Sequence, residues 1–203
     1  MDAFCFLAAI PMRSEPSDKS EMVSQLVYGE VAEVLRREEK WSLVQCRYDG
    51  YKGWIDNKQY APFSSAATLA ESCFLGTPYL WGGRSHGGID CSGLTQVCFK
   101  ANGVWLPRDA SQQATAGMDV CPCDIQEDDL AFFCSANGQP DASGWPEEDS
   151  SYRVTHVGIC RGNGTIIHSS GCVRIDKLDG LGIFNGAAYT HRLISVRRVA
   201  TPE

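Results

Sequence analysis

Short apolar runs separated by turn residues dominate this sequence and restrict the folds open to it. Within residues 1–62 these runs read FCFLAAI, MVSQLVY, VAEVL, WSLVQCRY and YKGWI. Asp49-Gly50 lies between the last two runs, and this dipeptide between apolar runs is typical of a β-hairpin turn. We therefore predict a small all-β barrel or sandwich over residues 1–62, followed by a linker at APFSS.

Residues 63–203 mix helical and strand patterns, which predicts a second region that combines helices and strands. ATLAESCFLG reads as a helix ending at Gly76. DCSGLTQVCFKANG has apolar residues at helical spacing, with Asp90 as N-cap and Gly103 as the stop. Strand-like runs follow in DLAFFC, VTHVGIC, GTIIHSS, CVRID and RLISVRRV. We expect the polar, acidic segment 138–152 to form a long surface loop that shapes a cleft.

Composition excludes several functional classes. The net charge of −7 opposes binding to nucleic acid or to an anionic membrane, and no apolar run approaches a membrane span. The N-terminal apolar run is short and follows an acidic residue, unlike a signal peptide. The ten cysteines lie mostly in apolar runs and are too few for a disulfide-dense scaffold. We therefore expect a cytoplasmic protein with reduced cysteines.

The sequence also bears on metal and cofactor binding. Its only close cysteine pair is Cys121-Pro122-Cys123, whereas structural zinc sites favour paired C-x-x-C spacings. We therefore expect neither a metal nor a cofactor.

Cys91 stands where the glycine-rich loop GGID gives way to the predicted helix. There the unpaired backbone N–H groups and the helix dipole favour an anion. We therefore expect the pKa of Cys91 to fall below its ordinary value of about 8.5, which would make the thiol a nucleophile. The same N–H groups are able to hold an oxyanion. The alternative is that Cys91 is one more small core residue.

A thiol nucleophile needs a base, and the base needs an orienting group. His156 and His168 lie on strands joined by residues 162–164. A two-residue turn would put the two histidines on opposite faces, whereas a three-residue loop pairs His168 with Gly158 and gives them one face. We predict the shared face; the alternative is two ordinary strand histidines. We interpret His86 and His191 as candidates for surface positions.

The run LGTPYLWGGRSHGGIDCSGLTQVCFKANGVWLPRDASQQ, with DDLAFF, THVGIC and TIIHSS downstream, resembles the NlpC/P60 family of cysteine peptidases. IPMRSEPSDKSEMVSQLVYGE and GYKGWID resemble the bacterial SH3-like domain that often precedes it. The resemblance implies a papain-like α+β catalytic domain over residues 63–203, after a small all-β SH3-like barrel over residues 1–62. It assigns Cys91 as nucleophile, His156 as base and His168 as the orienting residue. Ala110 replaces a serine common among relatives, so one substrate contact is expected to be missing.

The resemblance also implies a substrate. Similar members hydrolyse murein peptides between the γ-carboxyl of D-glutamate and a diamino acid such as meso-diaminopimelate. We expect the type that acts on freed peptides beginning with L-Ala, releasing L-Ala-γ-D-Glu during cell-wall recycling. The alternatives are a secreted hydrolase of intact murein, a non-catalytic wall-binding protein and, with no lipid-binding feature in its favour, an acyltransferase.

The substrate contacts follow partly from chemistry and partly from the resemblance. An L-Ala ammonium needs a carboxylate, because leaving it unpaired and desolvated is costly. Asp90 or Glu15 would supply that carboxylate, and Tyr79 would assist the oxyanion. The full set of expected substrate-binding residues is Glu15, Tyr51, Tyr79, Trp81, Asp90 and Ser92.

Overall fold

The computed structural model describes residues 1–136, 140, 144 and 153–200. It divides into two compact units, Met1–Cys73 and Phe74–Glu203, each described by itself below. The predicted loop 138–152 lies almost entirely outside the described residues. Among the helices that are described, none is long and apolar enough to cross a membrane.

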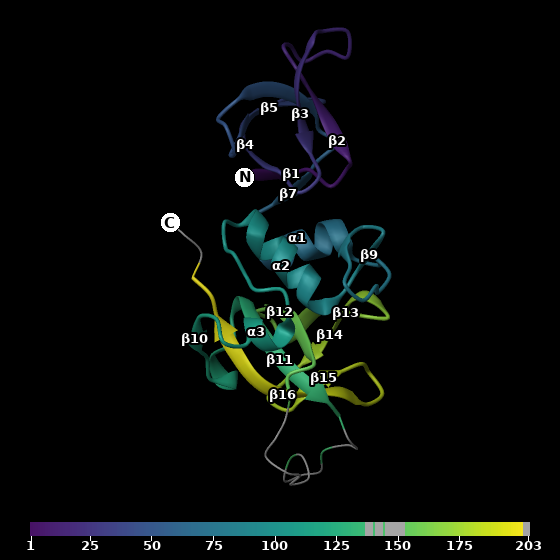
Figure 1. Ribbon diagram of the computed structural model, residues 1–203, viewed down its shortest axis with the longest axis vertical. Helices are drawn as coiled ribbons and strands as arrows, with labels where there is room; N and C mark the ends of the chain where they lie inside the picture. The colour runs from purple at the N-terminus through teal and green to yellow at the C-terminus, as the bar shows by residue number, and fades with distance from the viewer. Residues whose placement is uncertain (137–139, 141–143, 145–152, 201–203) are drawn as a thin grey trace. The chain divides into compact units, whose positions relative to one another are not determined.

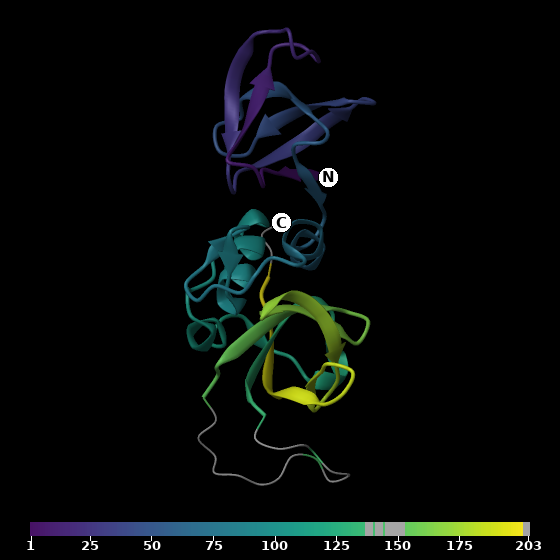
Figure 2. The ribbon, with the colours of Figure 1, turned by 90° about the vertical axis from the view of Figure 1, so that its right-hand side faces the viewer.

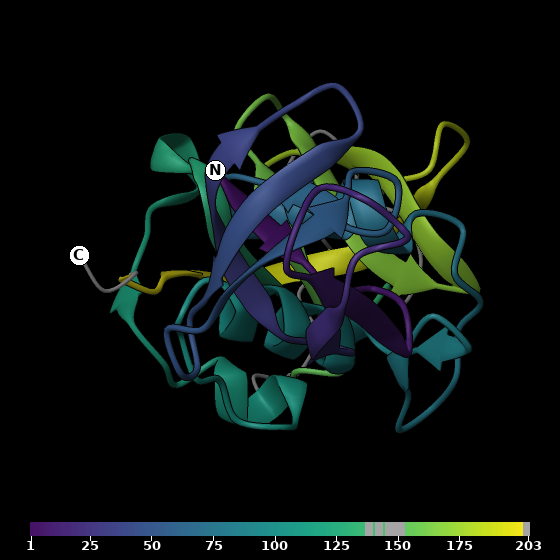
Figure 3. The ribbon, with the colours of Figure 1, turned by 90° about the horizontal axis from the view of Figure 1, so that it is seen from above.

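The first unit is a seven-stranded antiparallel sheet in the order β3-β2-β6-β5-β4-β1-β7. It curls into a ring in Figure 1, and Figure 3 shows it from above. Alternate residues of its strands point inward and enclose a core that includes Ile10, Leu26, Val44 and Ile55. The strands are β1 (Asp2–Phe4), β2 (Ala9–Arg13), β3 (Met22–Val27), β4 (Val31–Arg37), β5 (Trp41–Cys46), β6 (Lys52–Asp56) and β7 (Ala61–Phe63).

Two turn predictions for this unit have different outcomes. The hairpin at Asp49-Gly50 joins β5 to β6 as expected, and Gly50 takes a positive φ of 74° that suits glycine. The linker expected at APFSS is wrong in its first half, because residues 61–63 form β7 and pair with β1. The predicted domain boundary after residue 62 falls inside that strand and stays a prediction.

The chain leaves the sheet through α1 (Ala66–Leu69) and a π-helical turn, η1 (Ala70–Phe74), which replace the single predicted helix. The second unit then begins with β8 (Arg84–Ser85), β9 (Gly88–Ile89), α2 (Cys91–Ala101) and α3 (Ala110–Gln113). After these come β10 (Met118–Asp119), the 3₁₀ turn η2 (Pro122–Asp124) and β11 (Glu127–Ser135). The remaining strands are β12 (His156–Arg161), β13 (Thr165–Ser170), β14 (Cys172–Leu178), β15 (Gly182–Phe184) and β16 (Tyr189–Arg198).

The larger sheet of the second unit closes on itself. Its order is β10-β16-β11-β12-β13-β14-β15, and β15 pairs back onto β16, so the strands form a barrel (Figure 2). Phe133, Cys160, Ile166 and Val196 are among the residues packed within it. Helix α2 packs on β12 and β13. This is the predicted α+β architecture, with the start of α2 beside the strands that carry His156 and His168.

Candidate active site

The start of α2 is fixed by Asp90, which is its N-cap as predicted. Its carboxylate accepts a hydrogen bond of 2.7 Å from the Gly93 N–H on one oxygen and one of 2.7 Å from the Gly82 N–H on the other. The helix begins at Cys91 and ends near Gly103, whose φ is 80°. One side chain therefore ties the glycine loop to the first turn of the helix and sets the position of Cys91.

Close backbone packing explains the glycines around this turn. A Cβ atom on Gly93 would lie 2.3 Å from the Gly83 carbonyl oxygen, and one on Gly83 would lie 2.4 Å from the Gly88 carbonyl oxygen. A Cβ on Gly88 would lie 2.5 Å from the Leu80 Cβ. Any larger residue at these three positions would push the loop away from the helix start.

Arg108 completes the polar cluster and was missed in the sequence analysis. Its guanidinium donates to both Asp90 oxygens, at 2.6 and 3.0 Å, and to the Ser92 hydroxyl at 2.8 Å. Burial alone would raise the pKa of Asp90, but the hydrogen bonds from Arg108 and from the Gly93 and Gly82 N–H groups outweigh it and lower that pKa. Asp90 is therefore an ion-paired carboxylate, and its assignment to a substrate ammonium stays a prediction.

A cavity of about 890 Å³ opens beside the helix start. Five of the expected residues line it, namely Tyr79, Trp81, Asp90, Cys91 and Ser92. Ala110, the position at which relatives often have serine, also lines it, with Ser111 next to it. Trp81 is 85% exposed and stands at the surface, whereas Cys91 is 7% exposed. The cavity therefore reaches the thiol from solvent.

The pKa of Cys91 departs from the sequence prediction. Burial raises it above the ordinary value, although a hydrogen bond from the Val157 backbone opposes the rise. The nearby Asp90 carboxylate raises the pKa of Cys91 further, and hydrogen bonds from the Ser92 and Cys91 backbone only partly offset this rise. Sequence reasoning counted the helix start but not the burial or the neighbouring carboxylate. At neutral pH the resting group is therefore a thiol, which needs a base to become a nucleophile.

His156, His168 and Asp176 form a chain of contacts across strands β12, β13 and β14. Gly158 pairs with His168 across a three-residue loop, so His156 and His168 share a face, as predicted. His156 Nε2 lies 2.8 Å from His168 Nδ1, and His168 Nε2 lies 3.0 Å from an Asp176 oxygen. Arg174 holds the same Asp176 oxygen at 2.8 Å. The contact with His168 engages Nε2 of His156, and the role of His156 as the base for Cys91, through Nδ1, stays a prediction.

The surroundings of His156 destabilise its protonated, positively charged form. Burial lowers its pKa well below the ordinary value, and His168 and His191 add to the effect. His191, a candidate for a surface position, is half-buried and stacks on the His156 ring at 4.3 Å between centroids. Burial lowers the pKa of His191 to about 4. His156 is thus a neutral imidazole, able to accept a proton from Cys91.

Tyr79 and Gln113 are further polar residues of the site, and His86 lies nearby in the glycine loop. Burial raises the pKa of Tyr79, and Cys91, once ionised, and the Asp90 carboxylate would raise it further, so its hydroxyl keeps its proton and is able to donate to an oxyanion. Gln113 on α3 binds the first turn of α2 by donating to the Ser92 carbonyl at 3.0 Å. His86, the other proposed surface histidine, is half-buried and stacks on Phe74.

Glu15 and Tyr51 lie in the first unit. Glu15 is exposed just after β2, and Tyr51 is 44% exposed just before β6. The two strands are antiparallel, with Arg13 opposite Trp54, so both residues flank the same end of this strand pair. Their exposure rules out packing inside the barrel as the role of Tyr51. Their part in substrate binding stays a prediction.

A thiol at a helix start, a neutral imidazole oriented by a second imidazole, and backbone N–H donors are the parts that nucleophilic thiol catalysis uses. Family comparison agrees with this class. The NlpC/P60 family matches residues 76–198, and the bacterial dipeptidyl-peptidase SH3 domain matches residues 12–59. The chain therefore belongs to the NlpC/P60 family.

Individual relatives extend the comparison. The chain is 44% identical over 125 residues to the γ-D-glutamyl-L-lysine dipeptidyl-peptidase of Bacillus subtilis, covering 62% of this chain and 37% of that protein. It is 38% identical over 131 residues to the enzyme of the same name from Bacillus cereus, covering 60% and 36%. The chain thus aligns with just over a third of the length of these relatives.

A solved structure matches both units. The crystal structure of an NlpC/P60 family protein from Bacillus cereus superimposes with a TM-score of 0.59 and 26% sequence identity. The superposition covers 99% of this chain and 63% of that one. The shared fold therefore includes the SH3-like unit as well as the papain-like unit.

Proposed function

We propose that this chain is a cysteine peptidase that cuts murein-derived peptides after L-Ala-γ-D-Glu. Cys91 carries the proposal: it lies on the cavity at the start of α2, and its sulfur accepts a hydrogen bond from the backbone of Val157, the residue next to His156. The names of the Bacillus relatives support the γ-D-glutamyl bond and the dipeptide product. The match of the first unit to the SH3 domain of bacterial dipeptidyl-peptidases supports the same type.

The proposed reaction starts from a neutral Cys91 thiol and a neutral His156 imidazole. His156 takes the proton of Cys91 as the sulfur attacks the γ-carbonyl carbon, and the oxyanion forms beside the Cys91 and Ser92 N–H groups with Tyr79 as a further donor. His156 then passes the proton to the leaving amine of the diamino acid, which leaves a thioester on Cys91. Water, deprotonated by His156, releases the dipeptide and restores the thiol.

The N-terminal amine of the substrate is the proposed basis of selectivity. We assign Glu15, with Tyr51 as its hydrogen-bonding companion, to the L-Ala ammonium. Asp90 already accepts from Arg108 and two backbone N–H groups, so it has less capacity for a further donor. Such a gate would exclude intact murein, in which the alanine is acylated, and would suit a recycling role in the cytoplasm.

A cytoplasmic location is part of the proposal, and it requires cysteines that stay reduced. All ten cysteines, which lie in the described part of the chain, are free thiols. Free thiols are typical of a reducing environment. The alternative function is a secreted hydrolase of intact murein. Such an enzyme would also cut peptides whose N-terminal amine is acylated, so a comparison of free and N-acetylated peptides distinguishes the two functions.

Hydrolysis of L-Ala-γ-D-Glu-L-Lys and its N-acetylated form tests this proposal. Because an unpaired buried charge or partner costs about 1–3 kcal/mol, we expect kcat/KM to be at least about tenfold higher for the free amine. Glu15→Gln should raise KM for the free peptide, whereas Glu21→Gln, on the same exposed loop, should not. Equal cleavage of both peptides by the wild type would reject the gate and favour the murein hydrolase.

A further inference from the structure

Two of the ten cysteines are exposed, and only one residue separates them in sequence. Cys121 and Cys123 are exposed, whereas the other eight are buried or half-buried. Exposed thiols are prone to oxidation, so surfaces generally avoid them. Neither residue lines the cavity that contains Cys91. Two exposed thiols within one turn therefore call for a role of their own.

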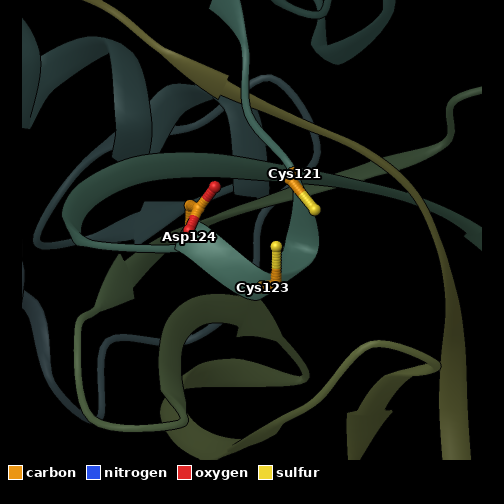
Figure 4. A group of neighbouring side chains, drawn as sticks. All are labelled: Cys121, Cys123 and Asp124. Carbon is orange, nitrogen blue, oxygen red and sulfur yellow. The ribbon is translucent and has the colours of Figure 1, made fainter.

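The turn brings three metal-binding groups together. The Cys121 and Cys123 sulfur atoms and a carboxylate oxygen of Asp124 all lie within 4.8 Å of one another. Figure 4 shows the two sulfur atoms facing each other, with Asp124 on the next part of the turn. Ligands of a tetrahedral Zn²⁺ with Zn–S bonds of about 2.3 Å lie about 3.8 Å apart, so small side-chain rotations would close the set around one ion.

The backbone of this turn is fixed independently of any ligand. Pro122 sets the first residue of η2, and the Asp124 N–H donates to the Cys121 carbonyl at 2.8 Å. Arg198 donates to the Asp124 carbonyl at 3.0 Å and forms an ion pair of 2.7 Å with Asp129, which is 1% exposed. Arg198 therefore anchors the turn through its backbone and leaves the Asp124 carboxylate on the side of the thiols.

We propose that Cys121, Cys123 and Asp124 form a surface site for a thiophilic divalent cation, for which Zn²⁺ is the best physiological match. Two thiolates select against Mg²⁺ and Ca²⁺, which prefer oxygen ligands. The chain supplies three ligands, and water fills the fourth tetrahedral position. Binding exchanges the two thiol protons for the cation, so both protons go to solvent. The C-x-C spacing differs from the paired C-x-x-C of structural zinc, and the site is on the surface rather than in a core.

Metal titration of the full-length, reduced chain tests the site. All variants carry Cys91→Ser, which removes the Cys91 thiol as a possible metal ligand and makes the result independent of the proposed peptidase activity. Cd²⁺ is the probe for thiolate bonds, through its ultraviolet charge-transfer band, and Zn²⁺ affinity is measured by competition with a chromogenic chelator. We expect one equivalent of Zn²⁺, release of two protons and a higher melting temperature with Zn²⁺.

Variants locate the binding. Cys121→Ser/Cys123→Ser should abolish the Cd²⁺ band and weaken Zn²⁺ binding by at least about a hundredfold, and Asp124→Asn should weaken it by about tenfold. The matched control, Cys73→Ser/Cys172→Ser, removes the two half-buried thiols and should bind as the background does. Equal binding by the Cys121/Cys123 double variant would overturn the proposal. A reduced chain that takes up no Zn²⁺ would also overturn it.

Discussion

His156 Nε2 lies 2.8 Å from His168 Nδ1, across a hairpin in which His168 follows His156 by twelve positions. Both rings are buried, and the second nitrogen of His168 is occupied by Asp176. One assignment of the tautomers satisfies both contacts: His168 donates from Nε2 to the carboxylate, and its Nδ1 accepts from His156 Nε2–H. His156 is then left with an accepting Nδ1, which is what a base for Cys91 requires.

Asp176 acts in this account as a positioning residue. Asp176→Asn would remove the preference of His168 for donating from Nε2 and so disturb the tautomer of His156. We expect kcat to fall by roughly tenfold, equivalent to about 1.4 kcal/mol in the barrier, with KM nearly unchanged. Lys177→Gln, an exposed neighbour on β14, is the matched control. A variant with unchanged kcat would show that Asp176 serves the fold alone.

The resting state of the thiol has its own test. Because burial raises the pKa of Cys91 and lowers that of His156, the pair is neutral rather than an ion pair at pH 7. The rate of Cys91 alkylation by iodoacetamide should therefore keep rising with pH beyond the ordinary thiol pKa of about 8.5. The rate is measured by peptide mass spectrometry from pH 5 to pH 10. A plateau already reached near pH 6 would instead indicate a thiolate–imidazolium pair.

His191 makes stability depend on pH. Its pKa of about 4 in the folded chain lies below the unfolded value of about 6.5, so the unfolded state binds more protons between these limits. The free energy of unfolding should therefore fall as pH drops from 6.5 to 4, by on the order of 2 kcal/mol from this group. His191→Phe keeps a ring against His156 without the proton.

Urea unfolding at pH 7 and pH 5 measures this effect. The wild type should lose more stability between the two pH values than His191→Phe does, whatever the difference between them at pH 7. Titrating groups away from His191 are common to both proteins and cancel in the comparison, whereas His156, whose pKa His191 helps to lower, adds to the difference in the same direction. Identical losses would mean that His191 does not carry the linkage.

Local signals made much of the site predictable. The Asp90 cap, the helix stop at Gly103 and the three-residue loop before His168 each depend on residues close in sequence, and the structure has all three. The strand β7 was missed because its pairing with β1 joins the two ends of the first unit.

Interactions between distant segments account for the remaining differences. Arg108 reaches Asp90 from beyond the end of α2, and His191 reaches His156 from the last strand. Because the partners are far apart in sequence, neither contact can be predicted from a local sequence pattern. The direction of the Cys91 pKa was also wrong for this reason, because burial is set by the packing of α2 on β12, which the helix sequence alone does not contain.

The central claim is that Cys91 cuts the γ-D-glutamyl bond, and product analysis tests it most directly. L-Ala-γ-D-Glu-meso-diaminopimelate is incubated with wild type, Cys91→Ala and Cys98→Ala, and the products are identified by mass spectrometry. Cys98 is fully buried on the same helix, so its replacement should cost on the order of 1 kcal/mol of stability and leave the reaction intact. We predict L-Ala-γ-D-Glu and free diaminopimelate from wild type and Cys98→Ala, and none from a folded Cys91→Ala. Release of the dipeptide by Cys91→Ala at the wild-type rate would contradict the account.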